Sequence, residues 1–290
     1  MVVLPEAKII MKNTTLISEK MSYSSYAYLL VFSSFIIRCD FTKNESQTET
    51  DTPSSQNIAY QIVGDFPHDT TSFTEGFLIH NGELWESGGG PEEIPLAKSM
   101  FGTVNRETGK VNIKVELEKK VYFGEGICIL NNNIYQLTYK NQKGFVYDLK
   151  TLKKIKEFTY ANTEGWGLTT DGKSLIMTDG TYEITFLDPE SLSVIKKLAV
   201  KENGYAIDKI NEPEWVNGFI FANIWMTNTI VKIDPANGQI VAKADLGELA
   251  SRAKNQYAGS MEMNGIAFDS GKNQLLVTGK LWPKIFVLQL

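Results

Sequence analysis

The chain has 290 residues and a formal net charge of −5, and 42% of its residues are hydrophobic and 22% charged, which is ordinary globular composition. The acidic balance and the lack of a Lys/Arg stripe argue against a nucleic-acid-binding protein. The chain has only two histidines, His68 and His80, and two cysteines, Cys39 and Cys128. These counts argue against a zinc site built from His and Cys and against a disulfide framework, so we expect no metal held by side chains.

Residues 1–39 are predicted to be an export segment. A short apolar run at 26–37 follows Lys12 and Lys20 and is of the length of a signal-peptide core rather than a transmembrane helix. Cys39 comes directly after this run, which is typical of a bacterial lipoprotein cleaved before the cysteine and acylated on it, although Arg38 stands where a small residue is usual. Simple cleavage or an uncleaved anchor remain alternatives. The expected location is the periplasm, either free or anchored to the membrane through lipid on Cys39.

Residues 40–56 are rich in Thr, Ser, Asn and Glu, and their composition predicts a flexible polar tether. From residue 57 onward the sequence repeats a short landmark in which glycine or proline accompanies a polar or aromatic residue. The copies are Phe-Thr-Glu-Gly at 73–76, Phe-Gly-Glu-Gly at 123–126, Glu-Gly-Trp-Gly at 164–167, Asn-Glu-Pro-Glu-Trp at 211–215 and Met-Asn-Gly-Ile at 263–266. A period of roughly 40–50 residues is typical of β-propeller blades.

Each landmark is followed by a predicted strand, a tight turn and a second strand. Strands at 77–80 and 83–86 flank Asn81-Gly82, those at 168–170 and 174–177 flank Asp171-Gly172, and those at 215–216 and 219–222 flank Asn217-Gly218. Asn-Gly and Asp-Gly supply the positive φ that a two-residue hairpin needs. Third strands are predicted at 145–148, 184–188 and 230–234, each followed by a turn and a fourth strand. A single short helix is predicted at 246–253.

The last repeat ends with a third strand at 284–290, and its fourth strand is predicted at 58–63. Pairing these two segments closes the ring and removes an exposed sheet edge. We therefore predict an all-β fold for residues 57–290: one five-bladed β-propeller of four-stranded antiparallel blades, closed by an N-terminal strand.

The landmarks can be explained by packing, because propeller blades commonly keep glycine and an aromatic residue at fixed places. Residues kept only for packing would be similar in every copy. Here the five copies differ and carry Glu75, Glu125, Trp166, Asn211 and Met263 at related places. This variation favours a site assembled from several blades.

Seven strings in order along 57–290 resemble the glutamine cyclotransferase family of the plant and bacterial type. They are Phe-Thr-Glu-Gly (73–76), Tyr-Phe-Gly-Glu-Gly (122–126), Gly-Trp-Gly-Leu-Thr-Thr-Asp-Gly (165–172), Asn-Glu-Pro-Glu-Trp (211–215), Ala-Asn-Ile-Trp (222–225), Asn-Gly-Ile-Ala (264–267) and Thr-Gly-Lys-Leu-Trp-Pro-Lys (278–284). The resemblance implies a five-bladed propeller enzyme. It further implies that N-terminal Gln of peptides or proteins is converted to pyroglutamate with release of ammonia, without a redox cofactor. Because a single propeller is often sufficient alone, we also expect a monomer.

The resemblance implies three catalytic residues. Glu125 matches the family's catalytic Glu and would carry the proton from the amine to the leaving ammonia. Lys280 matches the family's Lys and would donate to the amide oxygen and depress the pKa of Glu125. Asn211 matches the family's Asn and would polarise the same amide. The structural alternatives are that Glu125 ties down a loop, that Lys280 is a solvated surface charge and that Asn211 is a turn residue.

The remaining substrate-binding residues implied by the resemblance are aromatic. Trp166, Trp225, Phe73 and Phe123 match residues that wall the family's pocket, although aromatic residues in β proteins more often belong to the core.

At three places the sequence departs from the family's pattern. Glu75 stands where the papaya-type sequence has Gln, which adds a carboxylate beside Glu125 and would raise one pKa of the pair. Tyr139 stands where the family often has a pocket Trp. The segment 88–96 replaces a short Gly-Leu-Tyr-Gly string and is expected to border the mouth of the pocket. The family also implies a structural calcium bound by backbone oxygens in the central channel, which leaves little trace in a sequence.

Three other readings stay open. A non-catalytic propeller could bind a peptide or a sugar with the same aromatic residues, but it would not need both Glu125 and Lys280. A glycosidase would need two carboxylates at a defined separation, a requirement that Glu75 and Glu125 could imitate. A metal-dependent lactonase would need several inward carboxylates or amides on one ion, and no string in the sequence requires this.

Overall fold

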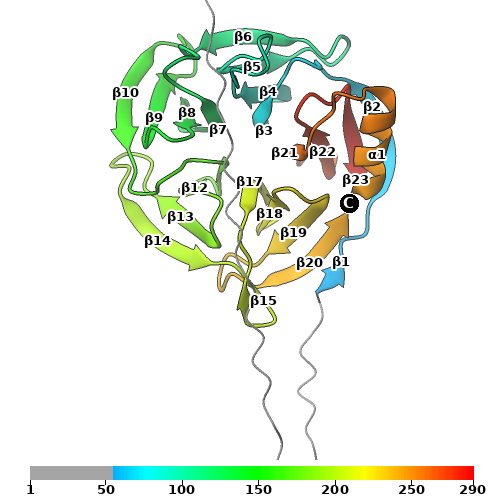
Figure 1. The fold of residues 1–290 in the computed structure, drawn as a ribbon. Helices are drawn as coiled ribbons and strands as arrows, with labels where there is room; N and C mark the ends of the chain where they lie inside the picture. The colour runs from blue at the N-terminus through cyan, green and yellow to red at the C-terminus, as the bar shows by residue number, and fades with distance from the viewer. Residues whose placement is uncertain (1–54) are drawn as a thin grey trace, which may run out of the picture. The chain divides into compact units, whose positions relative to one another are not determined.

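The structure is a computed structural model, and it describes residues 55–290. The predicted export segment at 1–39 and the tether up to residue 54 lie outside the described residues. Five antiparallel sheets are arranged around a central axis, which confirms the five-bladed β-propeller (Figure 1). In the first four blades four consecutive strands run from the axis outward, whereas in the fifth blade the outermost strand comes from the N-terminal part of the described chain.

The blades share one order of strands, from the innermost to the outermost. The first blade contains β3 (Thr74–His80), β4 (Glu83–Gly88), β5 (Met100–Val104) and β6 (Val111–Glu116). The second contains β7 (Gly124–Leu130), β8 (Asn133–Thr138), β9 (Lys143–Asp148) and β10 (Lys154–Thr159). The third contains β11 (Leu168–Thr170), β12 (Leu175–Met177), β13 (Glu183–Leu187) and β14 (Val194–Ala199). The fourth contains β17 (Ile210–Val216), β18 (Phe219–Ile224), β19 (Thr229–Ile233) and β20 (Ile240–Asp245). The fifth contains β21 (Met263–Asp269), β22 (Gln274–Gly279), β23 (Lys284–Gln289) and β2 (Gln61–Pro67).

The N-terminal strand closes the ring, as predicted, but it lies further along the chain than 58–63. Strand β2 pairs antiparallel with β23, from Gln61 opposite Gln289 to Pro67 opposite Lys284. Ile58 and Tyr60 do not belong to this strand, because they pack against the apolar cluster of the fourth and fifth blades. The two-residue strand β1 (Gln56–Asn57) pairs in parallel with β20 and adds an outer strand to the fourth blade.

In four of the five blades the landmark coincides with a break in the inner strand, whereas in the third blade it lies just before β11, which pairs without a shift. The register between the first and second strands shifts at Thr74/Gly76, Gly124/Ile127, Asn211/Glu214 and Met263/Ile266. A β-bulge leaves residues out of the ladder and redirects their side chains. Glu75, Glu125 and Asn264 fall inside these breaks and are free to face the channel.

The glycines of the landmarks are explained by contact between neighbouring blades. A Cβ atom on Gly126 would lie 2.4 Å from the backbone N of Leu168, and one on Gly167 would lie 2.2 Å from Cδ of Pro213. Because only glycine permits this approach of backbones, the packing explanation accounts for the glycines and leaves their polar neighbours unexplained.

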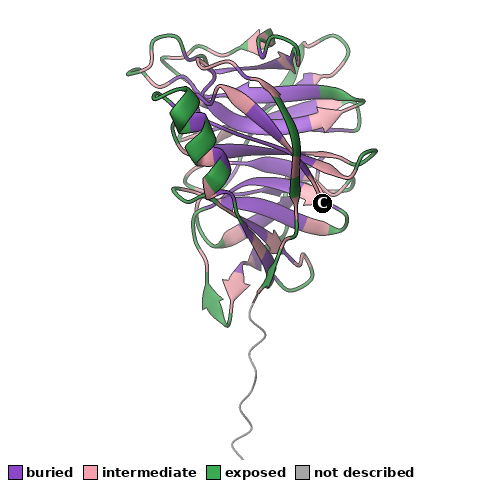
Figure 2. Ribbon diagram, turned by 90° about the vertical axis from the view of Figure 1, so that its right-hand side faces the viewer, coloured by how far each residue is buried: buried purple, intermediate pink, exposed green. Residues whose placement is uncertain are grey.

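The hydrophobic core lies between adjacent blades rather than inside one sheet pair. One cluster joins the first three blades, another the third and fourth, and another the fourth and fifth. Figure 2 shows the buried strands stacked through the ring, with exposed residues on the outer face of the helix. The predicted helix is α1 (Gly247–Gln256), which buries Leu249 and Ala253 against the last blades. No helix in the described part of the chain is long and apolar enough to span a membrane.

A buried ion pair fastens the seam between the first and last blades. His68, directly after β2, places Nε2 3.1 Å from Oε2 of Glu86 in β4, and its Nδ1 lies 2.9 Å from the carbonyl oxygen of Trp282. Both partners are acceptors, so they match the two donors of a protonated imidazole. Burial alone would lower the pKa of His68, but Glu86 and the Trp282 carbonyl outweigh burial and raise it.

We expect His68→Ala to lower the free energy of unfolding by roughly 3–5 kcal/mol, because the buried Glu86 carboxylate loses its partner. The raised pKa means that the pair stabilises the fold fully below the unfolded pKa of His. This stabilisation is lost as the pH rises through the folded pKa. Urea unfolding at pH 6 and pH 9 should therefore show the larger deficit at pH 6. His80→Ala is the matched control, and an equal loss in both variants would contradict the role of the pair.

Candidate active site

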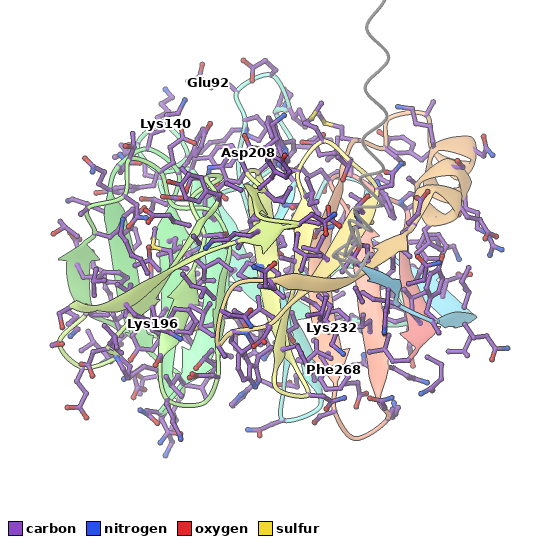
Figure 3. All side chains as sticks on the ribbon, turned by 90° about the horizontal axis from the view of Figure 1, so that it is seen from below. Glu92, Lys140, Lys196, Asp208, Lys232 and Phe268 are labelled. Carbon is purple, nitrogen blue, oxygen red and sulfur yellow. The ribbon has the colours of Figure 1, made fainter. Side chains whose placement is uncertain are left out.

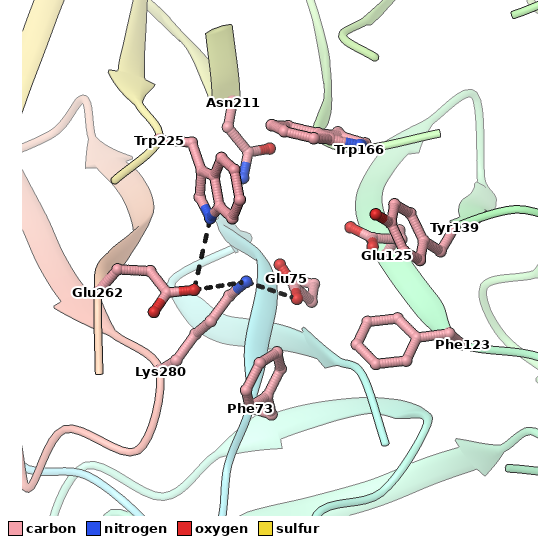
Figure 4. Close-up of a pocket in the computed structure, with 10 residues that line it drawn as sticks. All are labelled: Phe73, Glu75, Phe123, Glu125, Tyr139, Trp166, Asn211, Trp225, Glu262 and Lys280. Carbon is pink, nitrogen blue, oxygen red and sulfur yellow. Dashed lines mark hydrogen bonds and ion pairs between the residues drawn. The ribbon is translucent and has the colours of Figure 1, made fainter. Parts of the chain in front are cut away.

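One cavity of about 200 Å³ collects all nine residues predicted for the site. It is lined by Phe73, Glu75, Phe123, Glu125, Tyr139, Trp166, Asn211, Trp225, Glu262 and Lys280 (Figure 4). The only member that the sequence analysis missed is Glu262. Figure 3 shows Lys140, the residue after Tyr139, on the same face as Glu92 and Asp208 and opposite Phe268. We infer that the cavity opens on the face of the ring that carries Lys140.

The site residues come from equivalent places in different blades. Glu75, Glu125 and Asn211 lie in the inner strands β3, β7 and β17, within or beside the register breaks. The others flank the inner ends of strands: Phe73, Phe123 and Trp166 come before an inner strand, and Tyr139, Trp225 and Lys280 come directly after a second strand. The cavity therefore depends on the assembled ring, because no blade contains more than a part of it.

Lys280 is the positive centre of the cavity. Its Nζ lies 2.8 Å from Oε1 of Glu75 and 3.4 Å from Oε1 of Glu262, and 4.6 Å from the centre of the Phe73 ring. Its side chain is only 7% exposed, so the solvated surface charge considered from sequence is excluded. Burial by itself would lower the pKa of Lys280, but the surrounding carboxylates raise it. Lys280 is therefore a permanent cation.

The pKa of Glu125 differs from the sequence-based expectation. Burial is the largest influence and raises it well above the usual range, the charge of Glu75 raises it further, and Lys280 lowers it by less. The expected depression by Lys280 is thus outweighed, because the ammonium is paired directly with Glu75 and Glu262. Figure 4 shows Glu125 across the cavity from Lys280.

The sequence analysis expected a second carboxylate to raise the pKa of one member of the pair, and in the structure Glu75 does raise the pKa of Glu125. Burial raises the pKa of Glu75 to about 7, although Lys280 and a hydrogen bond from Asn264 act against this shift. Two carboxyls with raised pKa values in one cavity are typical of a site that handles protons.

The walls of the cavity are aromatic rings held edge to face. Phe73 and Phe123 have centroids 5.9 Å apart at 85°, and Trp166 and Trp225 have centroids 5.4 Å apart at 73°. Tyr139 continues the wall, 5.8 Å from Phe123. The indole nitrogens are anchored, since Trp166 Nε1 donates to Glu164 and Trp225 Nε1 donates to Glu262.

The segment 88–96 supports this wall from behind. The backbone N of Gly89 donates to the carbonyl of Phe73, and a Cβ on Gly89 would lie 2.1 Å from the Phe123 ring. Ile94 packs with Phe73 and Phe123 in one apolar cluster. A substitution in this segment would reach the cavity through the two phenylalanines.

Two participants escaped the sequence analysis. Glu262 precedes the last landmark, and Asn264 lies within it but was given no role. Asn264 is fully buried and hydrogen-bonds both Glu75 and Asn211. The available signal was the last landmark together with the residue before it, where a carboxylate and an amide stand two positions apart.

Among residues 55–290, no group of three or more His, Cys, Asp or Glu side chains is placed to hold a metal ion. Calcium held by backbone oxygens in the channel stays a prediction, since this observation concerns side chains.

The fold and the site define a five-bladed β-propeller with an acid–base cavity at one mouth of the ring. The sequence model of the glutamine cyclotransferase family matches residues 34–290. The chain is 38% identical over 232 residues to the glutaminyl-peptide cyclotransferase of Arabidopsis thaliana, covering 79% of this chain and 71% of the relative. It is also similar to the crystal structure of Myxococcus xanthus glutaminyl cyclase, with a TM-score of 0.71 and 29% identity, covering 81% of this chain and 98% of that chain. The chain therefore belongs to the glutamine cyclotransferase family and is an enzyme.

We expect Lys280→Met to raise the pKa of Glu75 above its value of about 7, because the ammonium that favours the ionised carboxylate is removed. A carboxyl-carbon NMR titration would measure this shift. Lys284→Met is the matched control, since Lys284 pairs with Asp65 in a half-exposed ion pair on the closing strand. An unchanged titration of Glu75 in Lys280→Met would contradict the assigned electrostatics.

Proposed function

We propose that the protein is a glutaminyl-peptide cyclotransferase, which converts N-terminal Gln of peptides or proteins to pyroglutamate and releases ammonia. The proposal is supported by the family membership and by one observation above all: Glu125, Lys280 and an aromatic wall share a single cavity. A binder of apolar ligands would have no use for a buried acid opposite a buried cation.

The reaction exchanges one carbon–nitrogen bond for another. The α-amine nitrogen attacks the side-chain carbonyl carbon, and the new bond closes a five-membered ring. The bond to the amide nitrogen then breaks. One proton must leave the attacking nitrogen and one must reach the departing nitrogen, so that ammonia is released. Glu125 can perform both transfers in turn, and no net proton is gained or lost.

The raised pKa of Glu125 suits this exchange. A peptide α-amine has a pKa near 7.7–8.0, and proton transfer is most efficient when donor and acceptor are closely matched. An ordinary carboxyl, with a pKa of about 4.3, would be a poor acid for the leaving group. Burial of Glu125 and the charge of Glu75 raise the pKa of this carboxyl above its ordinary value, in the direction of the pKa of the amine.

Lys280 and Asn211 are assigned to the oxygen of the reacting amide. Negative charge develops on this oxygen when the ring closes, and a preorganised donor there contributes about 10²–10³ in rate. Lys280 supplies a permanent charge, and Asn211 supplies a neutral N–H group. Both side chains are buried, so water does not screen them.

The aromatic walls are assigned to the shape of the substrate. A cavity of about 200 Å³ is smaller than the roughly 300–1,000 Å³ of pockets for drug-sized ligands, so it suits one side chain and its amine. Rings fixed edge to face would hold the flexible Gln side chain in its folded shape, which removes conformational entropy from the barrier.

We expect Glu125→Gln to lower kcat for a short peptide beginning with Gln by at least about 10²-fold, because the amide cannot carry a proton. The measurement is ammonia release by protein lacking residues 1–39. Glu214→Gln is the matched control: Glu214 is equally buried and has a pKa raised to about 8, but it bonds Thr169 and the backbone N of Phe268 outside the cavity. A folded wild-type protein that releases no ammonia, with or without calcium, would favour a binding propeller instead.

We also propose that the protein acts after export, on the support of the apolar run at 26–37 and Cys39 in the sequence. When the full chain is expressed in a bacterium with labelled palmitate, we expect label on the wild type and none on Cys39→Ser. A labelled Cys39→Ser protein would exclude Cys39 as the acylated residue, and an unlabelled wild type in the soluble periplasmic fraction would exclude the lipid anchor.

A further inference from the structure

Asn264 connects two residues of the cavity without lining the cavity itself. It lies in the register break of β21 and is fully buried. Its side chain bonds Glu75 of the first blade and Asn211 of the fourth blade, so one amide joins three blades. Because both side-chain partners of this buried amide are cavity residues, its orientation affects the hydrogen bonds that they can make.

The orientation of the Asn264 amide is fixed by its neighbours. Its Nδ2 lies 2.8 Å from the backbone carbonyl oxygen of Thr74 and 2.8 Å from Oε2 of Glu75. The carbonyl can only accept, so the NH₂ group must face it whatever the protonation of Glu75. The oxygen of Asn264 must therefore face Asn211.

The orientation of the Asn211 amide follows. Its Nδ2 donates to Oδ1 of Asn264 at 2.9 Å, and its own Oδ1 accepts from the backbone N–H of Glu212 at 2.8 Å. This chain of hydrogen bonds ends at the Thr74 carbonyl, which can only accept, and at the backbone N–H of Glu212, which can only donate. No alternative arrangement of either amide satisfies both ends, and one N–H of Asn211 Nδ2 is left for a bound molecule.

We infer that Asn264 is a positioning residue that holds the Asn211 amide with its remaining N–H available to the reacting carbonyl oxygen, and that it ties this orientation to Glu75. The inference rests on the proposed function, because it assigns a purpose to Asn211 in that reaction. A rotated Asn211 would present an oxygen in place of the N–H and would repel the developing oxyanion.

Exchanging the carboxylate of Glu75 and the amide of Asn264 between the two positions tests this inference. In Asn264→Asp the donor to Glu75 is lost and two carboxyls face each other. In the double variant Asn264→Asp/Glu75→Gln, the Gln amide can donate to one oxygen of Asp while the other oxygen accepts from Asn211. The total charge of the pair is then that of the wild type and the repulsion between two carboxyls is removed, so the Asp oxygen that faces Asn211 can keep its place. The Thr74 carbonyl, which can only accept, remains without a donor.

We expect Asn264→Asp to lower kcat for a Gln peptide by about 10–100-fold with KM altered less than about threefold. The repelled carboxyls would displace the Asn211 amide, and the N–H of Asn211 acts mainly on the transition state. The double variant should recover at least about fivefold in kcat over Asn264→Asp. Glu75→Gln alone completes the cycle and measures how strongly the two residues are coupled.

Asn273→Asp is the matched control, because Asn273 has the same pattern of bonds away from the cavity. Its Nδ2 donates to the Leu290 carbonyl and its Oδ1 accepts from Nδ2 of Asn217. We expect its kcat to equal that of the wild type. Thermal unfolding of all variants separates a loss of fold from a loss of orientation.

A second readout needs no turnover. The side-chain ¹H–¹⁵N signals of Asn211 should exchange slowly with solvent in the wild type, faster in Asn264→Asp, and slowly again in the double variant. Unchanged kcat and unchanged exchange in Asn264→Asp would overturn the inference, as would a double variant no better than the single one. Absence of ammonia release by the wild type would instead count against the proposed function, while the exchange measurement would still decide the role of Asn264.

Discussion

Closure of the ring is the constraint on which the rest of the structure depends. Strand β2, from the beginning of the described chain, pairs with β23 at its end, and the His68–Glu86 pair fastens the same seam. The pairing between Lys280 and Glu75 crosses this seam, because Lys280 belongs to the last blade and Glu75 to the first. An open ring would separate the cation from its carboxylate and expose a sheet edge. The same contact thus serves stability and the electrostatics of the cavity.

The electrostatics of the cavity follow from burying more carboxyls than cations among aromatic side chains. Lys280 is bonded to two carboxylates and cannot also neutralise Glu125 by direct contact. Burying an unpaired carboxylate is costly, and the protein avoids this cost by favouring the protonated form of Glu125. The same raised pKa makes the ionised Glu125 a stronger base toward the amine and makes the protonated Glu125 less poorly matched to the leaving nitrogen, as the proposed ring closure needs. Burial of Glu125 therefore destabilises its carboxylate and, for the same reason, supplies the raised pKa that the proposed chemistry uses.

The repeat reconciles packing with function within a few residues. In the inner strands of the first two blades a glycine permits the next blade to approach, as Gly126 does for Leu168, and the accompanying break in the ladder redirects the side chain of the residue beside it. The residue beside the glycine can differ between blades, because the close approach of the two backbones is made at the glycine itself. Glu75, Glu125 and Asn264 occupy such positions, and Asn264 shows that one of them supports its neighbours rather than lining the cavity. Blades with the same backbone arrangement can in this way contribute different side chains to one site.

The sequence by itself determined the five blades, most hairpin turns and the nine cavity residues. The turns are local, because Asn81-Gly82 or Asn217-Gly218 sets its own backbone, and the cavity residues lie in strings that resemble a known family. The sequence also predicted the closing strand, but it placed the strand too early, because apolar residues such as Ile58 and Tyr60 look the same in a strand and against a neighbouring blade. Only the tertiary structure decided the partners of Lys280, the direction of the Glu125 pKa and the part of Asn264. These depend on burial and on distances between residues far apart in the chain, such as 2.8 Å between Asn264 and Glu75, and no local pattern encodes such distances.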